Sequence, residues 1–187
     1  MRSYNGRMKR FRFGILLWTA ATVLGFGLAA GLSAQETDHH AKSAVPSTEL
    51  TITGAEGNVL VLTPDVFAAL PHKEVSVFNA HSKANEKYSG VPLIELLAKV
   101  GVPQGEQMKG KAFLTGVVAE GTDHYDVLFA LGEIDPSVHT GEVLVADSVN
   151  GQKLGKDGVF KMVSTEEKRP ARWVRNLSFL KVVAVAP

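Results

Sequence analysis

The chain has 187 residues, of which 45% are hydrophobic and 21% charged, and it contains no cysteine. This size and composition predict one ordinary globular domain. The absence of cysteine excludes disulfides, thiolate metal sites, iron–sulfur clusters, covalent haem attachment and cysteine nucleophiles.

The net charge of +1 conceals a basic N-terminal segment. Residues 1–34 carry five basic side chains and no acidic one, which leaves 15 basic against 19 acidic side chains in the rest of the chain. Binding to a polyanion needs a net basic face. We therefore expect no nucleic-acid partner.

The basic start precedes an uncharged apolar run, Phe13 to Leu32, which is followed by Ser33 and Ala34. This order is typical of an export signal. The alternative is an uncleaved membrane anchor, because about 20 apolar residues can span a bilayer. Either interpretation predicts a periplasmic or secreted domain. The protein touches the membrane only if its N-terminal segment stays uncleaved. No adjacent arginines mark a twin-arginine signal, so export as an unfolded chain is the simpler expectation.

Residues 35–48 are polar, and we interpret them as a linker between the signal and the domain. They include Asp38-His39-His40, whose imidazoles and carboxylate are groups that bind divalent metals. Adjacent histidines on a tail lack the surrounding hydrogen bonds that orient true ligands. We favour a solvated linker over a metal site.

We expect the folded domain to occupy residues 49–185. In its first half, Thr63 precedes Pro64 and Asp65, a combination typical of a helix start. Gly101 is placed to end a second helix. The expected elements are a hairpin of Leu50–Thr53 and Asn58–Leu62, a helix from Pro64 to Leu70, a strand at Val75–Phe78, a polar loop over Asn79–Ser89 and a helix from Pro92 to Val100.

The second half is dominated by short apolar runs that favour strands. Asn150-Gly151 is a strong signal for a tight hairpin turn. The expected strands are Ala112–Val118, Tyr125–Phe129, Val143–Ala146, Phe160–Val163 and Ser178–Val185. Many strands with two or three short helices, irregularly spaced, predict an α+β fold that is mostly β.

The segment from Lys168 to Arg175 has four cations in eight residues around Trp173. One interpretation is an anion-docking site, because arginine matches phosphate or sulfate oxygens. The other is an exposed loop, balanced by Glu166 and Glu167, with the indole in the core. The sequence leaves both open, and it contains no nucleotide-binding, metalloprotease or hydrolase motif.

Several weak motifs share an order and spacing that resembles the sulfite-oxidase-like molybdopterin-binding domain over residues 49–185. The segments that carry it are Leu62-Thr63-Pro64-Asp65, Ala69-Leu70-Pro71, Gly90 to Leu97, Asp123-His124-Tyr125, Asn150 to Leu154, Gly158 to Val163 and Arg172-Trp173-Val174. The resemblance implies an α+β fold with a buried pterin cofactor, molybdenum at its head and oxygen-atom or two-electron transfer.

The resemblance also implies where cofactor or anion contacts would lie. Lys161 stands where the family tends to have an arginine, and Arg169 and Arg172 stand where its late basic residues fall. The candidate cofactor-binding residues are Asn79, His81, Tyr125, Lys161, Arg169 and Arg172. No catalytic residue and no metal ligand is assigned.

The family ligates molybdenum through a cysteine in the loop after the strand that corresponds here to Val75–Phe78. This chain has no cysteine, and neither Asn79 nor His81 reproduces the charge and electron donation of a thiolate. We therefore expect no bound cofactor, although molybdopterin is implied by the resemblance.

Three functions remain open. The first is a degenerate member that binds a small anionic ligand, or an extracytoplasmic protein partner, in the former cofactor pocket. The second is an active molybdopterin-dependent oxidoreductase whose metal has no protein thiolate. The third is a structural or interaction module without a ligand.

Overall fold

The computed structural model describes residues 45–80 and 82–185. The predicted export signal or anchor, Asp38-His39-His40 and His81 lie outside the described residues. Within the described part, no helix is both long and apolar enough to cross a membrane.

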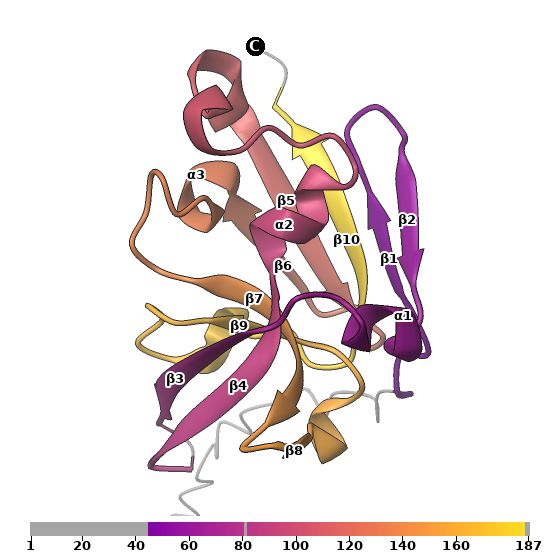
Figure 1. Cartoon of the computed structure of the whole chain (residues 1–187), viewed down its shortest axis with the longest axis vertical. Helices are drawn as coiled ribbons and strands as arrows, with labels where there is room; N and C mark the ends of the chain where they lie inside the picture. The colour runs from indigo at the N-terminus through magenta and orange to yellow at the C-terminus, as the bar shows by residue number, and fades with distance from the viewer. Residues whose placement is uncertain (1–44, 81, 186–187) are drawn as a thin grey trace, which may run out of the picture. The chain divides into compact units, whose positions relative to one another are not determined.

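Two five-stranded sheets form the framework of the domain (Figure 1). In the first sheet the strand order is β2-β1-β10-β5-β6, and β1 runs parallel to β10 while the other neighbours are antiparallel. Its strands are β1 (Leu50–Thr53), β2 (Val59–Leu62), β5 (Thr115–Gly121), β6 (Asp126–Ala130) and β10 (Leu177–Ala184).

The second sheet is antiparallel throughout, with the order β3-β4-β7-β8 and with β9 also paired to β7. Its strands are β3 (Lys73–Asn79), β4 (Ala84–Pro92), β7 (Val143–Val149), β8 (Gln152–Lys153) and β9 (Lys161–Ser164). Asn150 and Gly151 both have positive φ at the β7–β8 turn, as the sequence predicted.

Short helices connect the strands. The Thr63 hydroxyl accepts a 3.4 Å hydrogen bond from the Val66 amide and caps α1, which begins at Pro64 as expected. The helices are α1 (Pro64–Ala68), α2 (Leu93–Ala98) and α3 (Leu131–Ile134), with single 3₁₀ turns η1 (Gly105–Gln107), η2 (Gly110–Leu114), η3 (Gly155–Asp157) and η4 (Pro170–Arg172). The α+β class predicted from the sequence is confirmed.

The main core joins side chains of α2 and the first sheet with several from β4, β7 and β9 of the second sheet. Leu96 and Leu97 of α2 are fully buried, as are Leu50 and Ile52 of β1. A smaller cluster that includes Tyr88 and Trp173 packs on the second sheet. Alternate residues of each strand supply these cores, so the period of two fixes which side chains turn inward.

Two expected elements differ from the structure. The segment Asn79–Ser89, expected to be a polar loop, is largely strand β4, which pairs with β3 and β7. The sequence did not predict this strand because one of its inward positions is Glu86, which is half-buried and not apolar. The strand expected at Ala112–Val118 begins only at Thr115, after the 3₁₀ turn η2.

A glycine fixes the approach of η3 to the start of β10. Gly158 has φ +96°, and a Cβ placed there would lie 2.3 Å from Oδ1 of Asn176. The Asn176 amide in turn donates a 2.8 Å hydrogen bond to the Asp157 carbonyl. Only glycine fits this contact, which holds Asp157 beside the cavity described next.

Candidate ligand-binding cavity

A cavity of about 780 Å³ is lined by residues from the second sheet, from the β5–β6 turn and from the segments around η3 and η4. This volume lies within the range of pockets that bind drug-sized molecules. Its walls mix aromatic and apolar side chains with six charged ones. The charged residues are Glu86, Asp123, Lys156, Asp157, Lys161 and Arg175.

A chain of hydrogen bonds runs along the wall formed by β4 and β9. The Lys161 ammonium donates to the Tyr88 hydroxyl at 3.0 Å and to Oδ2 of Asp157 at 2.6 Å. The Tyr88 hydroxyl donates to Oε2 of Glu86 at 2.6 Å. Asn79 and Ser82 also donate to the Glu86 carboxylate, each at 2.8 Å. We call this arrangement the Lys161–Tyr88–Glu86 chain.

Lys161 is only 4% exposed, which is unusual for a lysine. Its ammonium lies 4.9 Å from the ring centroid of Tyr88 and 5.3 Å from that of Trp173. The two rings meet edge to face at 5.6 Å, and the Trp173 indole donates to the Ser164 carbonyl at 3.0 Å. The Asp157 carboxylate and the two aromatic faces together offset the cost of burying this charge.

The same contacts set the protonation of Tyr88 and Glu86. Burial raises the pKa of the Tyr88 phenol far above its ordinary value, and the Glu86 and Asp157 charges add to the shift. Burial alone would raise the pKa of Glu86. Hydrogen bonds from Tyr88, Asn79 and Ser82, with the Lys161 charge, outweigh burial and lower the pKa below its ordinary value. At neutral pH the chain therefore holds a neutral phenol beside a carboxylate.

Asp157 lies between two cations of the cavity wall. Its Oδ2 accepts from Lys161, and its Oδ1 is 4.0 Å from the Arg175 guanidinium. Arg175 is largely exposed, so its attraction to Asp157 is weakened by solvent. Lys156, the residue before Asp157 in the chain, adds a third cation to the cavity lining.

The structure brings together three of the six predicted site residues. Asn79, Tyr125 and Lys161 line the cavity. The Tyr125 hydroxyl donates to the Ala171 carbonyl and ties η4 to the β5–β6 turn. Arg169 is exposed and Arg172 is half-buried, and neither lines this cavity. His81 lies outside the described residues.

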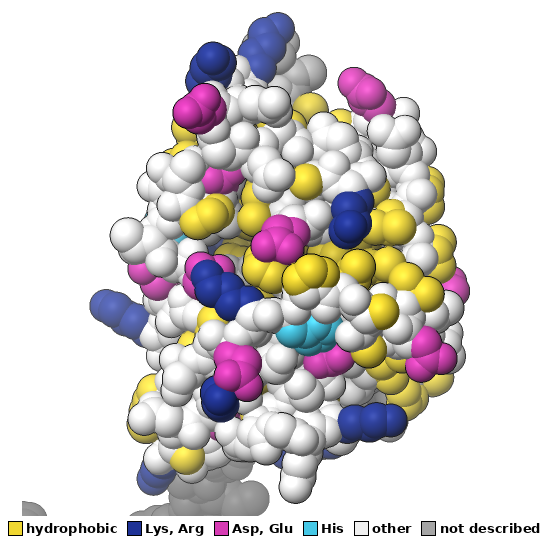
Figure 2. All heavy atoms as spheres, viewed as in Figure 1, with side chains coloured by type: hydrophobic (Ala, Val, Ile, Leu, Met, Phe, Trp, Pro, Cys, Tyr) yellow, Lys and Arg dark blue, Asp and Glu magenta, His cyan; other side chains and the backbone are white. Residues whose placement is uncertain are grey.

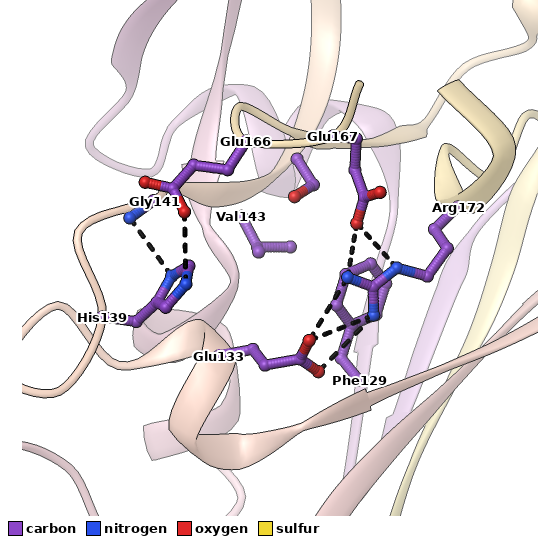
Figure 3. Close-up of a pocket in the computed structure, with 9 residues that line it drawn as sticks. Phe129, Glu133, His139, Gly141, Val143, Glu166, Glu167 and Arg172 are labelled. Carbon is purple, nitrogen blue, oxygen red and sulfur yellow. Dashed lines mark hydrogen bonds and ion pairs between the residues drawn. The ribbon is translucent and has the colours of Figure 1, made fainter. Parts of the chain in front are cut away.

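Arg172 instead lines a second, smaller cavity of about 210 Å³ (Figure 3). Its guanidinium lies between Glu133 and Glu167, with a 2.6 Å hydrogen bond to Glu167 and contacts of 3.3 Å to Glu133. It also lies 4.4 Å from the Phe129 ring centroid. Burial would raise the pKa of Glu133, but hydrogen bonds from Ala130 and Arg172 outweigh it and lower that pKa. The charge of Arg172 is thus already matched by two carboxylates.

Each of the two interpretations therefore describes one part of the basic segment from Lys168 to Arg175. Trp173 is turned into the core, with 6% exposure, and Glu167 balances Arg172. Arg175, however, lines the large cavity. On the face shown in Figure 2, Lys and Arg side chains are interspersed with Asp and Glu.

Most lining residues of the cavity were not among the predicted site residues, and those that form its hydrogen-bonded and charged contacts include Glu86, Tyr88, Asp157 and Arg175. Along β4, Glu86 and Tyr88 are two residues apart, so the period of a strand places both side chains on one face. Asp157 is the last residue of η3 and lies four residues before Lys161, with Gly158 between them, so neither a helix nor a strand period predicts their contact.

One mixed sheet and one antiparallel sheet with short helices define an α+β fold, and the cavity is lined in part by the second sheet. A solved structure, that of the sulfane dehydrogenase SoxCD from Paracoccus pantotrophus, superposes with a TM-score of 0.56 at 22% sequence identity. The match covers 73% of this chain but 39% of that chain, so the present chain spans well under half of the solved protein. No family model matches the chain, and no curated protein matches it.

The molybdenum cofactor that the resemblance implies does not fit these residues. The chain offers no thiolate to hold the metal. Three carboxylates share the cavity with three cations, and Asp157 already pairs with Lys161 and faces Arg175. Among the described residues, no group of three or more histidine or acidic side chains is placed to hold a metal ion.

Proposed function

We propose that this domain is a ligand-binding member of a redox-enzyme fold, which holds a small molecule with an anionic group in the large cavity and has no thiolate-held metal. The observation that carries the proposal is Lys161, a buried ammonium at the cavity wall. An ammonium donates three hydrogen bonds, and the described residues accept two of them.

The η3 side of the cavity favours an anion at this point. Lys161 and Arg175 lie 2.6 and 4.0 Å from the Asp157 carboxylate, so two cations meet one carboxylate here, and Lys156 also lines the cavity. In a site partly screened from water, such cations form charge-assisted hydrogen bonds to carboxylate, sulfonate or phosphate oxygens. The predicted export signal places this binding outside the cytoplasm as part of the proposal.

A thermal-shift and calorimetric series tests the proposal. Sulfate, phosphate and 3-phenylpropionate are titrated into the wild-type domain and into Arg175→Gln, with Lys181→Met as a control for loss of an exposed cation outside the cavity. We expect an organic anion to stabilise the wild type and Lys181→Met, and to bind Arg175→Gln several-fold more weakly. No stabilisation by any probe at millimolar concentration would favour a structural or interaction module.

A second candidate is a molybdopterin-dependent oxidoreductase whose metal has no protein thiolate. The specific observation in its favour is the likeness to a protein named as a sulfane dehydrogenase. Molybdenum and pterin analysis of protein from its native host separates this candidate from the first.

A further inference from the structure

The lining of the large cavity is balanced in charge, which is not what a simple anion site requires. Lys156, Lys161 and Arg175 provide three cations, and three carboxylates oppose them. A cavity that was complementary to an anion alone would present a clear excess of positive charge.

Glu86 is the carboxylate whose presence most needs a reason. It is half-buried and lines the cavity, and its oxygens accept from Tyr88, Asn79 and Ser82. Across residues 45–80 and 82–185, no lysine or arginine forms an ion pair with it. Two carboxylate oxygens offer about four acceptor positions, and three are used. One position remains for a donor that enters the cavity.

The positive and negative groups lie close together on the same wall. Glu86 and Lys161 both bond the Tyr88 hydroxyl, at 2.6 and 3.0 Å, so carboxylate and ammonium are two hydrogen bonds apart. A single small head group that carries both charges can reach both residues. A ligand whose charges were separated by a long chain would not match this spacing.

We propose that the ligand of this cavity is a compact zwitterion of the α-amino-acid or aminosulfonate type, with its amine at Glu86 and its acid group at Lys161. The inference rests on the proposed function and specifies its ligand class. Trp173, Leu154 and Val149 provide an apolar wall for the rest of the molecule. The volume of about 780 Å³ accommodates a large side chain or a second residue.

Three probes that share a phenylethyl unit test this ligand class. L-phenylalanine carries both charges, 3-phenylpropionate only the acid and 2-phenylethylamine only the amine. In calorimetric titrations of the full chain, we expect L-phenylalanine to bind about tenfold more tightly than either single-charge probe, the scale of one charge-assisted hydrogen bond. This comparison uses the wild type alone, so it does not depend on the folding of a variant.

Glu86→Gln removes the charge but keeps the size of the side chain. It should weaken L-phenylalanine about tenfold and leave 3-phenylpropionate unchanged, whereas Glu74→Gln, an exposed carboxylate on β3, should change neither. Equal binding of L-phenylalanine and 3-phenylpropionate by the wild type would overturn the zwitterion inference and leave the anion proposal standing. Failure of all three probes, and of sulfate and phosphate, to bind the folded wild type would overturn both.

Discussion

Asp157 accepts a 2.6 Å hydrogen bond from Lys161, so the most buried cation of the cavity already has a counterion within the protein. The two residues are four apart in the chain: Asp157 ends η3, Gly158 follows it, and Lys161 begins β9. An incoming anion must therefore share Lys161 with Asp157. On the proposed function, this relationship favours ligands that also gain contacts elsewhere, such as at Glu86.

Replacing Asp157 separates ligand binding from stability. Asp157→Asn removes the internal counterion, so we expect the affinity for 3-phenylpropionate to rise about fivefold, equivalent to about 1 kcal/mol. The same change leaves the buried Lys161 charge without its carboxylate and should lower the free energy of unfolding by about 1–3 kcal/mol. Calorimetry and urea denaturation measure the two effects. Weaker anion binding by this variant would show that Asp157 helps to form the anion site.

Arg172 is expected to act in stability and not in ligand binding. Arg172→Ala removes its bonds to Glu133 and Glu167 and its contact with Phe129, and should cost about 1–2 kcal/mol, discounted for its partial exposure. The affinity for 3-phenylpropionate should not change. A double-mutant cycle with Glu133→Gln should give a coupling energy above zero. A several-fold loss of anion affinity in Arg172→Ala would show that Arg172 takes part in ligand binding.

Acid should destabilise the domain through Glu86 and Glu133. Their pKa values are lowered in the fold, so both carboxylates stabilise it above their unfolded pKa, and this contribution is lost as pH falls through their folded pKa. Urea midpoints measured from pH 7 down to pH 3 should fall, and Glu133→Gln should flatten the decline. If the urea midpoints of the wild type and Glu133→Gln decline in parallel, the Arg172 contact does not stabilise the ionised form of Glu133.

Gly158 should be intolerant of any side chain. Gly158→Ala introduces a Cβ 2.3 Å from Asn176 at a φ of +96°, and we expect a loss of about 2 kcal/mol or more in the free energy of unfolding. Gly57→Ala is a matched control, because its φ is +85° but no atom lies within 4 Å of the added Cβ. It should cost about 1 kcal/mol from backbone strain alone. Equal losses of unfolding free energy at both sites would show that the Asn176 contact adds nothing to the cost of a side chain at Gly158.

The sequence predicted most elements of the fold because their signals are local. Thr63 and Pro64 start α1, and Asn150-Gly151 forms the β7–β8 turn, each by short-range geometry. The strand β4 was missed because Glu86 occupies an inward position where a core strand would place an apolar residue. The missed strand borders the cavity, because the inward Glu86 carboxylate faces the cavity and not the apolar core.

The candidate site was harder to predict because its contacts join distant segments. Lys161 was among the predicted cofactor-binding residues and lines the cavity, but Tyr88, to which it donates a hydrogen bond, is 73 residues away along the chain. Arg172 and Arg175 belong to one basic segment, yet they line different cavities. Residue type and spacing alone do not show which cations already have carboxylate partners in the fold.

The most direct test of the central claim is the molybdenum and pterin content of the protein purified from its native host. A cavity that binds a small organic ligand without a thiolate-held metal predicts molybdenum and pterin at background levels in folded protein. Stoichiometric molybdenum together with pterin would contradict the account and establish the oxidoreductase alternative.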